Sequence, residues 1–268
     1  MLGPYPIFCR GHSGGRLVCE AFMRNGIRMG NVTQAHKDSE FFSIRTNEKI
    51  RAVILHAYAY ERADKATRTR LQNLIKETVT EFVAAEIKWE GPFGWKIDPS
   101  LFTLPVVLDA FPSAKAVHVI RDGRDLMLSR LNARVEHLED PVNRVMMFGR
   151  ADVDSFMGRP IPSEKTVKKL RNELEMLHWV TSVEFGLRGR TYGARYLEVK
   201  YEDICAAPLA EFEKIFAFLG APFLDETKTW LLQAASTNRI GKWKTLPPEL
   251  LAAPLQIGGE LLEKLGYV

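Results

Sequence analysis

The sequence predicts an α/β fold in which a central, mostly parallel β-sheet is flanked by helices. Three short apolar runs at 5–9, 115–120 and 195–200 have the composition of buried strands. Stretches with helical periodicity separate these runs, and strands that alternate with helices favour parallel pairing. A glycine-rich bend, RGHSGGR at 10–16, follows the first run and opens directly into a helical pattern.

The composition is that of a globular protein. The 268 residues suit a single domain over 1–268, with 46% hydrophobic and 26% charged residues. A net charge of +4 suits an anionic ligand, but no nucleic-acid-binding motif accompanies it. Cys9, Cys19 and Cys205 lack metal-ligand spacing, so we expect no metal site. Cys9 and Cys19 flank the glycine bend within an apolar pattern, which favours buried thiols over a disulfide. Because no stretch approaches the roughly 20 apolar residues of a membrane span, we expect a soluble, cytoplasmic protein without stable membrane insertion.

In the first half of the chain, helical periodicity alternates with turn-rich segments. Pro105 lies inside a helical pattern, where it marks either a helix start or a kink. The expected elements are a helix from Gly14 that stops at Asn25-Gly26, a polar loop with short helical pieces at 26–48, a long helix at 65–89, a break with a short strand at 91–99, and a helix at 100–111.

The second half follows the same alternation of strands and helices. Residues 140–163 mix Pro, Gly, Met, Arg and Asp without a period, and we expect an excursion at about 135–165 that covers a substrate site. The expected helices are 123–138, 163–185 with Ser163 as its N-cap, 209–219 closed by Gly220, 225–235, and a last helix near the C-terminus.

The glycine bend has the features of an anion-binding loop. Glycines allow a sharp turn, and successive main-chain N–H groups attract an anion together with the positive end of the following helix. A nucleoside triphosphatase loop, GxxxxGK(S/T), would place Lys on the phosphates and Ser or Thr on Mg²⁺. Gly15-Arg16 stands there instead, so a metal role is unsupported. The alternative interpretation is a plain turn between a strand and a helix.

A second candidate site lies in VIRDGRDLMLS, at 119–129. Arg121 follows the predicted strand directly, a turn comes next, and Ser129 lies one to two helical turns later. An arginine at a strand end can hold a phosphate with two N–H groups, and a serine hydroxyl adds a third donor. The alternative is a surface cluster of ion pairs, because Arg and Asp are mixed here.

Four segments in this order resemble the sulfotransferases that use 3′-phosphoadenosine 5′-phosphosulfate (PAPS). They are the glycine bend, the segment from Arg121 to Ser129, "KYEDI…P…FLG" at 200–220 and "RIGKWK" at 239–244. The resemblance runs from about residue 6 to residue 249. It implies a sulfotransferase architecture similar to that of the P-loop NTPases. It also implies transfer of a sulfuryl group from PAPS to a hydroxyl, less often an amine, of a saccharide or other small metabolite.

The resemblance also implies which residues hold the donor. Arg121 and Ser129 match the pair that binds the 3′-phosphate, and Tyr201 matches a tyrosine near the adenine. The 5′-phosphosulfate would be held by Arg10, Gly11, His12, Ser13, Gly14, Gly15, Arg16 and Leu17. The segment that closes over the nucleotide would contribute Arg239, Lys242 and Trp243, although packing explains Trp243 equally well.

Two positions depart from the family pattern. His12 stands where many relatives have Lys or Arg before the Ser-Gly pair, and Arg16 replaces the usual second Thr. We expect His12 and Arg16 to share the stabilisation of the leaving group, adenosine 3′,5′-bisphosphate (PAP). The alternative for Arg16 is a position on the helix surface. Because a sulfuryl group carries less charge than a phosphoryl group, side chains and main-chain N–H groups suffice and no metal is needed.

The base that removes the proton of the acceptor is expected in one of two segments. HKDSEFF offers Asp38, Glu40 and His36, whereas WKIDP offers Asp98 with Lys96 beside it. A carboxylate in a partly dry site works as a base because burial raises its pKa. We prefer Asp38 over Asp98. Lys96 would either touch the sulfuryl group or pair with an aspartate.

Two other functions fit parts of the sequence. An ATP-dependent P-loop kinase would need Mg²⁺, and the missing Ser or Thr after the loop counts against it. A non-catalytic relative would bind the nucleotide with the same fold, which the changes at positions 12 and 16 leave open.

Acceptor contacts are expected from 31–60 and from the excursion. An anionic acceptor would suit Arg134, Arg144, Arg150 and Arg159, which are equally explained as a solvated basic face.

Overall fold

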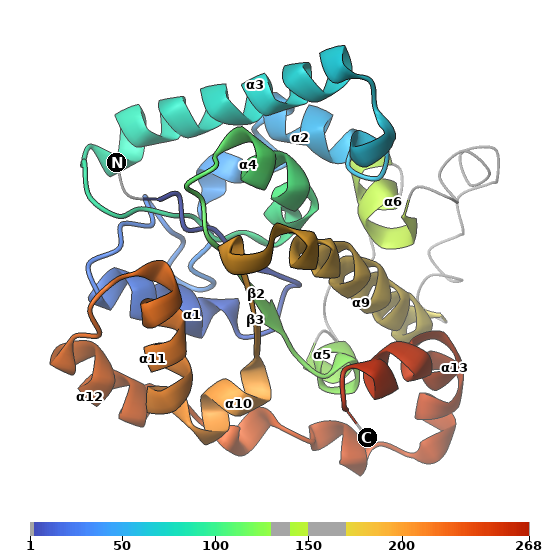
Figure 1. The fold of residues 1–268 in the computed structure, drawn as a ribbon. Coiled ribbons are helices and arrows are strands. Elements are labelled where there is room, and N and C mark those ends of the chain that lie inside the picture. The colour runs from blue at the N-terminus through green and yellow to red at the C-terminus, as the bar shows by residue number, and fades with distance from the viewer. Residues whose placement is uncertain (1–2, 130–139, 150–169, 268) are drawn as a thin grey trace.

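The computed structural model describes residues 3–129, 140–149 and 170–267, and within them it has the predicted α/β fold with a parallel sheet (Figure 1). The strands are β1 (Ile7–Cys9), β2 (Ala116–Ile120) and β3 (Tyr196–Lys200), which pair in the order β1-β2-β3. Both pairs are parallel. A further parallel bridge joins Ile7 to Lys96, in the break where a short strand was expected.

Most predicted helices are confirmed with shifted ends. The helix expected at 65–89 is α3 (Lys65–Phe82) followed by a π-helical turn, Val83–Ile87. Pro105 lies in the first turn of α4 (Leu104–Ala110), where its missing N–H breaks no helical hydrogen bond. The remaining helices with defined bounds are α1 (Gly15–Arg24), α2 (Glu48–Leu55), α5 (Gly123–Ser129), α6 (Pro141–Phe148), α9 (Arg171–Leu187), α10 (Tyr201–Ala206), α11 (Pro208–Leu219), α12 (Asp225–Ala234) and α13 (Pro248–Lys264), with 3₁₀ turns at Glu40–Phe42, Tyr60–Arg62, Asp98–Thr103, Arg188–Arg195, Thr237–Arg239 and Lys242–Thr245.

The two faces of the sheet are buried under different helices. Along β2, Val117 and Val119 belong to one apolar cluster with residues of α1 and α11, whereas Ala116 belongs to another with residues of α2, α3 and α4. This alternation follows from the two-residue period of a strand. Figure 1 shows α3 with α2 and α4 on one side of the sheet and α1, α11 and α12 on the other. Parallel sheets are covered on both faces in this way.

All three strands end at the same edge of the sheet. β1 runs into the glycine bend, β2 into Arg121 and β3 into Tyr201. The pairing places Cys9 opposite Val119 and Ile120 opposite Lys200, so the three strand ends lie side by side. Ligands of open parallel sheets bind at this carboxyl edge. The fold therefore gathers three of the predicted donor-binding segments at one place.

The excursion expected at 135–165 is described only between residues 140 and 149. Residues 130–139 and 150–169 lie outside the described residues, and with them Ser163, Arg134, Arg150 and Arg159. Within the excursion, α6 packs against α2 and α9. None of the helices in the described ranges has the length and apolar character that a bilayer crossing requires. Cys9 and Cys19 are buried free thiols, as predicted, and Cys205 is also free and buried.

Candidate active site

The glycine bend turns sharply between β1 and α1. His12 and Gly14 have positive φ angles of 69° and 93°. A Cβ atom at Gly14 would lie 2.1 Å from the ring of Tyr201, and one at Gly15 would lie 2.5 Å from the sulfur of Cys9. Neither position therefore accepts a side chain. The N–H groups of Gly15 and Arg16 open α1 and so have no partner within the helix. They form the kind of helix start that binds anions.

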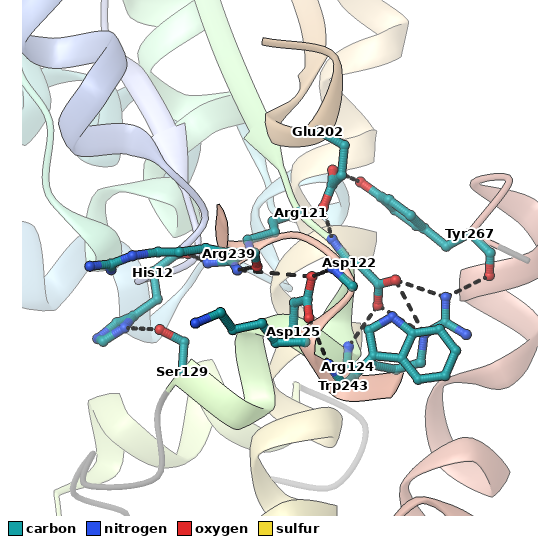
Figure 2. A network of polar contacts seen from close by, with 12 residues as sticks. His12, Arg121, Asp122, Arg124, Asp125, Ser129, Glu202, Arg239, Trp243 and Tyr267 are labelled. Carbon is teal, nitrogen blue, oxygen red and sulfur yellow. Dashed lines mark hydrogen bonds and ion pairs between the residues drawn. The ribbon is translucent and has the colours of Figure 1, made fainter. Parts of the chain in front are cut away.

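Arg121 connects the bend to the C-terminal part of the chain. Its Nη1 donates to the His12 carbonyl at 3.0 Å, and its Nη2 donates to the Arg239 carbonyl at 2.5 Å (Figure 2). The guanidinium lies over the ring of Tyr201, 4.9 Å from the centroid. Its Nε is buried and has no hydrogen-bond partner among the described residues. Three other residues that the sequence assigned to the same donor site, His12, Arg239 and Tyr201, thus surround the Arg121 guanidinium.

His12 and Arg16 reach different parts of the site. The Nδ1 atom of His12 lies 2.9 Å from the hydroxyl of Ser129 at the end of α5, as Figure 2 shows. Arg16 instead donates from Nη1 to the carbonyl of Ala35 at 3.2 Å. Ala35 precedes the segment that carries Asp38. The expectation that His12 and Arg16 share one task stays a prediction, and the geometry gives His12 the position nearer to Ser129.

Lys96 lies between the two preferred candidates for the base. Its Nζ donates to Asp38 Oδ1 at 2.7 Å and to the carbonyl of His36 at 3.1 Å, and it lies 3.9 Å from Asp98 Oδ1. A Cβ atom at Gly15 would be 3.0 Å from Lys96 Cε, so the lysine lies against the start of α1. The fold therefore brings both aspartates and Lys96 next to the glycine bend.

Burial governs the protonation of this cluster. Burial raises the pKa of Asp38, and the neighbouring Lys96 ammonium lowers it by less, so the pKa remains above its ordinary value. Burial alone would lower the pKa of Lys96, but Cys9, Asp98 and Asp38 outweigh it and raise the pKa, so Lys96 stays charged. Burial also raises the pKa of the Cys9 thiol to about 12. A carboxylate with a raised pKa beside a charged lysine is suited to accept a proton.

Arg10 extends the charged cluster into the core. Its Nη2 donates to Glu175 Oε2 in α9 at 3.1 Å, and its Nη1 lies 3.9 Å from Asp98 Oδ2. Glu175 is 2% exposed, and the sequence analysis did not single it out. The sequence signal that could have identified Glu175 is a carboxylate within an apolar helical pattern. Glu40 and His36, the weaker candidates for the base, are both exposed.

The closing segment, residues 236–245, carries Arg239, Lys242 and Trp243. It lies against the first turn of α5, shortly after β2, which holds it through Asp125 and Arg124 (Figure 2). Neither of these two residues was singled out from the sequence. The mixture of Arg and Asp after Arg121 suggested surface ion pairs, but both side chains are buried. In the described part of the chain, no group of three or more His, Cys, Asp or Glu side chains could hold a metal ion.

Comparison with known proteins identifies the family. The model of the sulfotransferase family matches residues 15–226. The chain belongs to the sulfotransferase family. The match begins inside the glycine bend, so His12 lies just before the matched residues of this sulfotransferase.

Curated relatives of this sulfotransferase include two from Mus musculus. Carbohydrate sulfotransferase 4 is 23% identical over 181 residues, which are 61% of this chain and 44% of the relative. Carbohydrate sulfotransferase 3 is 25% identical over 183 residues, which are 62% of this chain and 36% of the relative. The match thus spans less than half the length of either relative.

Solved structures confirm the predicted sulfotransferase fold. The sulfotransferase STF9 from Mycobacterium avium superposes with a TM-score of 0.58 at 12% identity, over 98% of this chain and 77% of that one. The sulfotransferase domain from the curacin biosynthetic pathway gives a TM-score of 0.56 at 13% identity, over 97% and 98%. At these identities the likeness shows the fold alone.

Proposed function

We propose that this sulfotransferase transfers the sulfuryl group of PAPS to a hydroxyl group of a saccharide or another small metabolite. One observation carries the proposal. The glycine bend, the Arg121–Ser129 segment and the closing segment come from distant parts of the chain and meet at the carboxyl edge of the sheet. These are the segments whose order along the chain resembles the PAPS-dependent enzymes.

Several groups at the carboxyl edge of the sheet suit an anion in the positions that the resemblance assigns. Any side chain at Gly14 would clash with Tyr201, so the ring of Tyr201 packs directly on the glycine bend. The first N–H groups of α1 are available for the 5′-phosphosulfate. The buried Nε of Arg121, together with the Ser129 hydroxyl, suits the 3′-phosphate. Tyr201 would then lie near the adenine, with Arg239, Lys242 and Trp243 on the other side of the nucleotide.

PAPS supplies a sulfuryl group already attached to a good leaving group. The chain would place three positively polarised groups around it: the start of α1, the His12 ring and the Lys96 ammonium. We propose that these groups balance the negative charge of the transferred group, and that the transfer therefore needs no metal ion. Arg16 would contribute less directly, because its guanidinium is bonded to the Ala35 carbonyl.

Asp38 is the proposed base. Burial raises its pKa, and its carboxylate lies on Lys96 beside the start of α1, where it can receive the proton of the attacking hydroxyl. Asp98 is the second candidate, because it lies 3.9 Å from both Lys96 and Arg10. A hydroxyl held next to Asp38 would approach the glycine bend directly. Positioning of this kind replaces part of the entropy cost of a two-substrate reaction.

A saccharide is the favoured acceptor, because the matching relatives are named carbohydrate sulfotransferases. Of the four arginines considered for an anionic acceptor, only Arg144 lies within the described residues, and it is 8% exposed.

We also propose a cytoplasmic location. The three buried free cysteines support it, since reducing compartments keep thiols unpaired.

The experiment is a transfer assay with radiolabelled PAPS and a panel of saccharides, phenols, lipids and peptides. We expect label on a hydroxyl-bearing acceptor with the wild-type protein, and a large loss with Asp38→Asn. If the protein binds PAP but labels no acceptor under any condition, it is a binding protein of this fold and the proposed reaction is wrong.

A further inference from the structure

Asp125 is a buried carboxylate that contacts the closing segment with both of its oxygens. Its side chain is 1% exposed and lies in the first turn of α5. Oδ2 accepts the N–H of Gly241 at 2.6 Å, and Oδ1 accepts the N–H of Trp243 at 3.0 Å. Hydrogen bonds to an ionised acceptor are about twice as strong as neutral ones. A single side chain thus joins two main-chain positions that lie more than a hundred residues away.

The same turn makes two more contacts with the closing segment. Arg121 donates to the carbonyl of Arg239, and the guanidinium of Arg124 lies 3.7 Å from the ring centroid of Trp243. Arg124 is itself held by Asp122, at 2.7 Å between Nη2 and Oδ2, and by the carbonyl of Tyr267. Figure 2 shows these contacts side by side. The turn after β2 therefore holds the segment at positions 239, 241 and 243.

Few other forces hold the closing segment in place. Its two 3₁₀ turns, Thr237–Arg239 and Lys242–Thr245, contain no buried residue. Burial of apolar area, which fixes most elements of a fold, therefore contributes little here. The position of the segment depends on polar contacts, and Asp125 supplies two of the strongest.

We infer that Asp125 is a positioning residue that anchors the closing segment over the donor site and thereby sets the affinity for the donor. The inference rests on the proposed function, in which Arg239, Lys242 and Trp243 contact the nucleotide. Asp125 Oδ2 also lies 4.0 Å from Arg121 Nη2, so the same carboxylate stabilises the arginine assigned to the 3′-phosphate. Asp125 itself contacts neither the donor nor the acceptor. Its loss should therefore change donor binding and leave the chemical step intact.

The test compares Asp125→Asn with the wild-type protein in two measurements. Asparagine keeps the size of the side chain but places an N–H group against one of the two N–H donors. We expect the Kd for PAP and the KM for PAPS to rise about tenfold or more, with kcat at saturating PAPS within about twofold of wild type. We also expect trypsin to cleave faster at the exposed Arg239, Lys242 and Lys244. PAP should slow this cleavage only at higher concentration.

Two further variants keep the test decisive. Asp109→Asn is the matched control, because Asp109 also accepts two hydrogen bonds, from Tyr60 and Tyr192, but in α4. It should leave the Kd for PAP and the cleavage pattern unchanged. Arg124→Gln removes the cation over Trp243 while Asp125 remains, and it should raise the Kd in the same direction. It takes the place of Asp125→Asn if that variant does not fold.

The outcomes separate this inference from the proposed function. If wild type binds PAP and Asp125→Asn binds it equally well with unchanged cleavage, the anchoring role is wrong and the proposed function stands. If wild type does not bind PAP, the proposed function fails and the link to donor affinity fails with it. Faster cleavage of Asp125→Asn without ligand would then still establish the anchor itself.

Discussion

The donor side and the acidic side of this site are built in different ways. The donor side consists of residues that directly follow strand ends, such as Arg121 and Tyr201, together with main-chain groups of the glycine bend. The acidic side consists of Asp38 from one loop and of Lys96 and Asp98 from another, and these three residues depend on one another for charge balance. The charge of the first side therefore comes from the permanent cation of Arg121, whereas the second side depends on carboxylates. Substitutions on the donor side should change binding, and those on the acidic side should change turnover.

The largest expected effect is on the acidic side. Asp38→Asn should lower kcat by about 10²–10⁴-fold, the usual loss when a general base is removed. Its Kd for PAP should stay near the wild-type value, because the closest contact of Asp38 is Lys96. Asp98→Asn is the matched control and should lower kcat by much less. The measurement is steady-state turnover with radiolabelled PAPS beside a PAP titration.

The pH dependence of kcat, measured for the wild-type protein and for the two variants Asp38→Asn and Asp98→Asn, tests the role of Asp38 further. Protonation of Asp38 removes the base, so kcat should fall as pH falls. Because burial raises the pKa of Asp38, this loss should begin at a higher pH than for an exposed aspartate. A larger loss in Asp98→Asn than in Asp38→Asn would exchange the roles of the two aspartates.

A smaller effect, on binding alone, is expected for Arg121→Lys. Lysine keeps the charge but cannot reach both the His12 and Arg239 carbonyls with a planar fork. We expect the KM for PAPS to rise by about a hundredfold, which is about 2.7 kcal/mol, with little change in kcat. Arg190→Lys is the control, because Arg190 also forms a forked pair, with Glu198, but on the exposed surface. A fall in kcat alone would place Arg121 on the chemical step.

The losses of kcat/KM caused by His12→Ala and by Arg16→Ala should differ by about the free energy of one hydrogen bond. His12→Ala loses the contact with Ser129 and should lower kcat/KM about tenfold, whereas Arg16→Ala loses a bond to the Ala35 carbonyl and should stay within about threefold. His12→Lys should recover most of the loss, because it places a permanent cation at that position. Unchanged turnover in all three variants would leave the bend without a catalytic role.

The smallest effect is expected for Tyr201→Phe. The ring of Tyr201 lies under the Arg121 guanidinium and against Gly14, so the ring rather than the hydroxyl supports the site. The Kd for PAP should stay within about twofold in Tyr201→Phe and rise about tenfold in Tyr201→Ala. Equal losses in both variants would move the role of Tyr201 to its hydroxyl.

The same division explains what could be read from the sequence. The three strands, the glycine bend and Arg121 have local signals, since β-branched runs, glycines and strand-end residues keep their meaning wherever the fold places them. Asp125 and Glu175 have none, because their roles depend on partners more than a hundred residues away. The helix α2 was not predicted either, since a polar first turn and a short apolar face give little periodicity. The sequence offered Asp38 and Asp98 as separate candidates for the base, and only the fold shows that both lie beside Lys96.

The central claim is that the carboxyl edge of the sheet binds the bisphosphate of PAPS rather than a nucleoside triphosphate. Thermal unfolding with PAP, and separately with ATP and Mg²⁺, tests it most directly. At a PAP concentration of about 100 times Kd, binding adds about 2.7 kcal/mol to the free energy of unfolding. For a chain of this size the account predicts a rise in Tm of several degrees with PAP, at about 2–4 °C per kcal/mol, and none with ATP and Mg²⁺. Stabilisation by ATP and Mg²⁺ alone would contradict it.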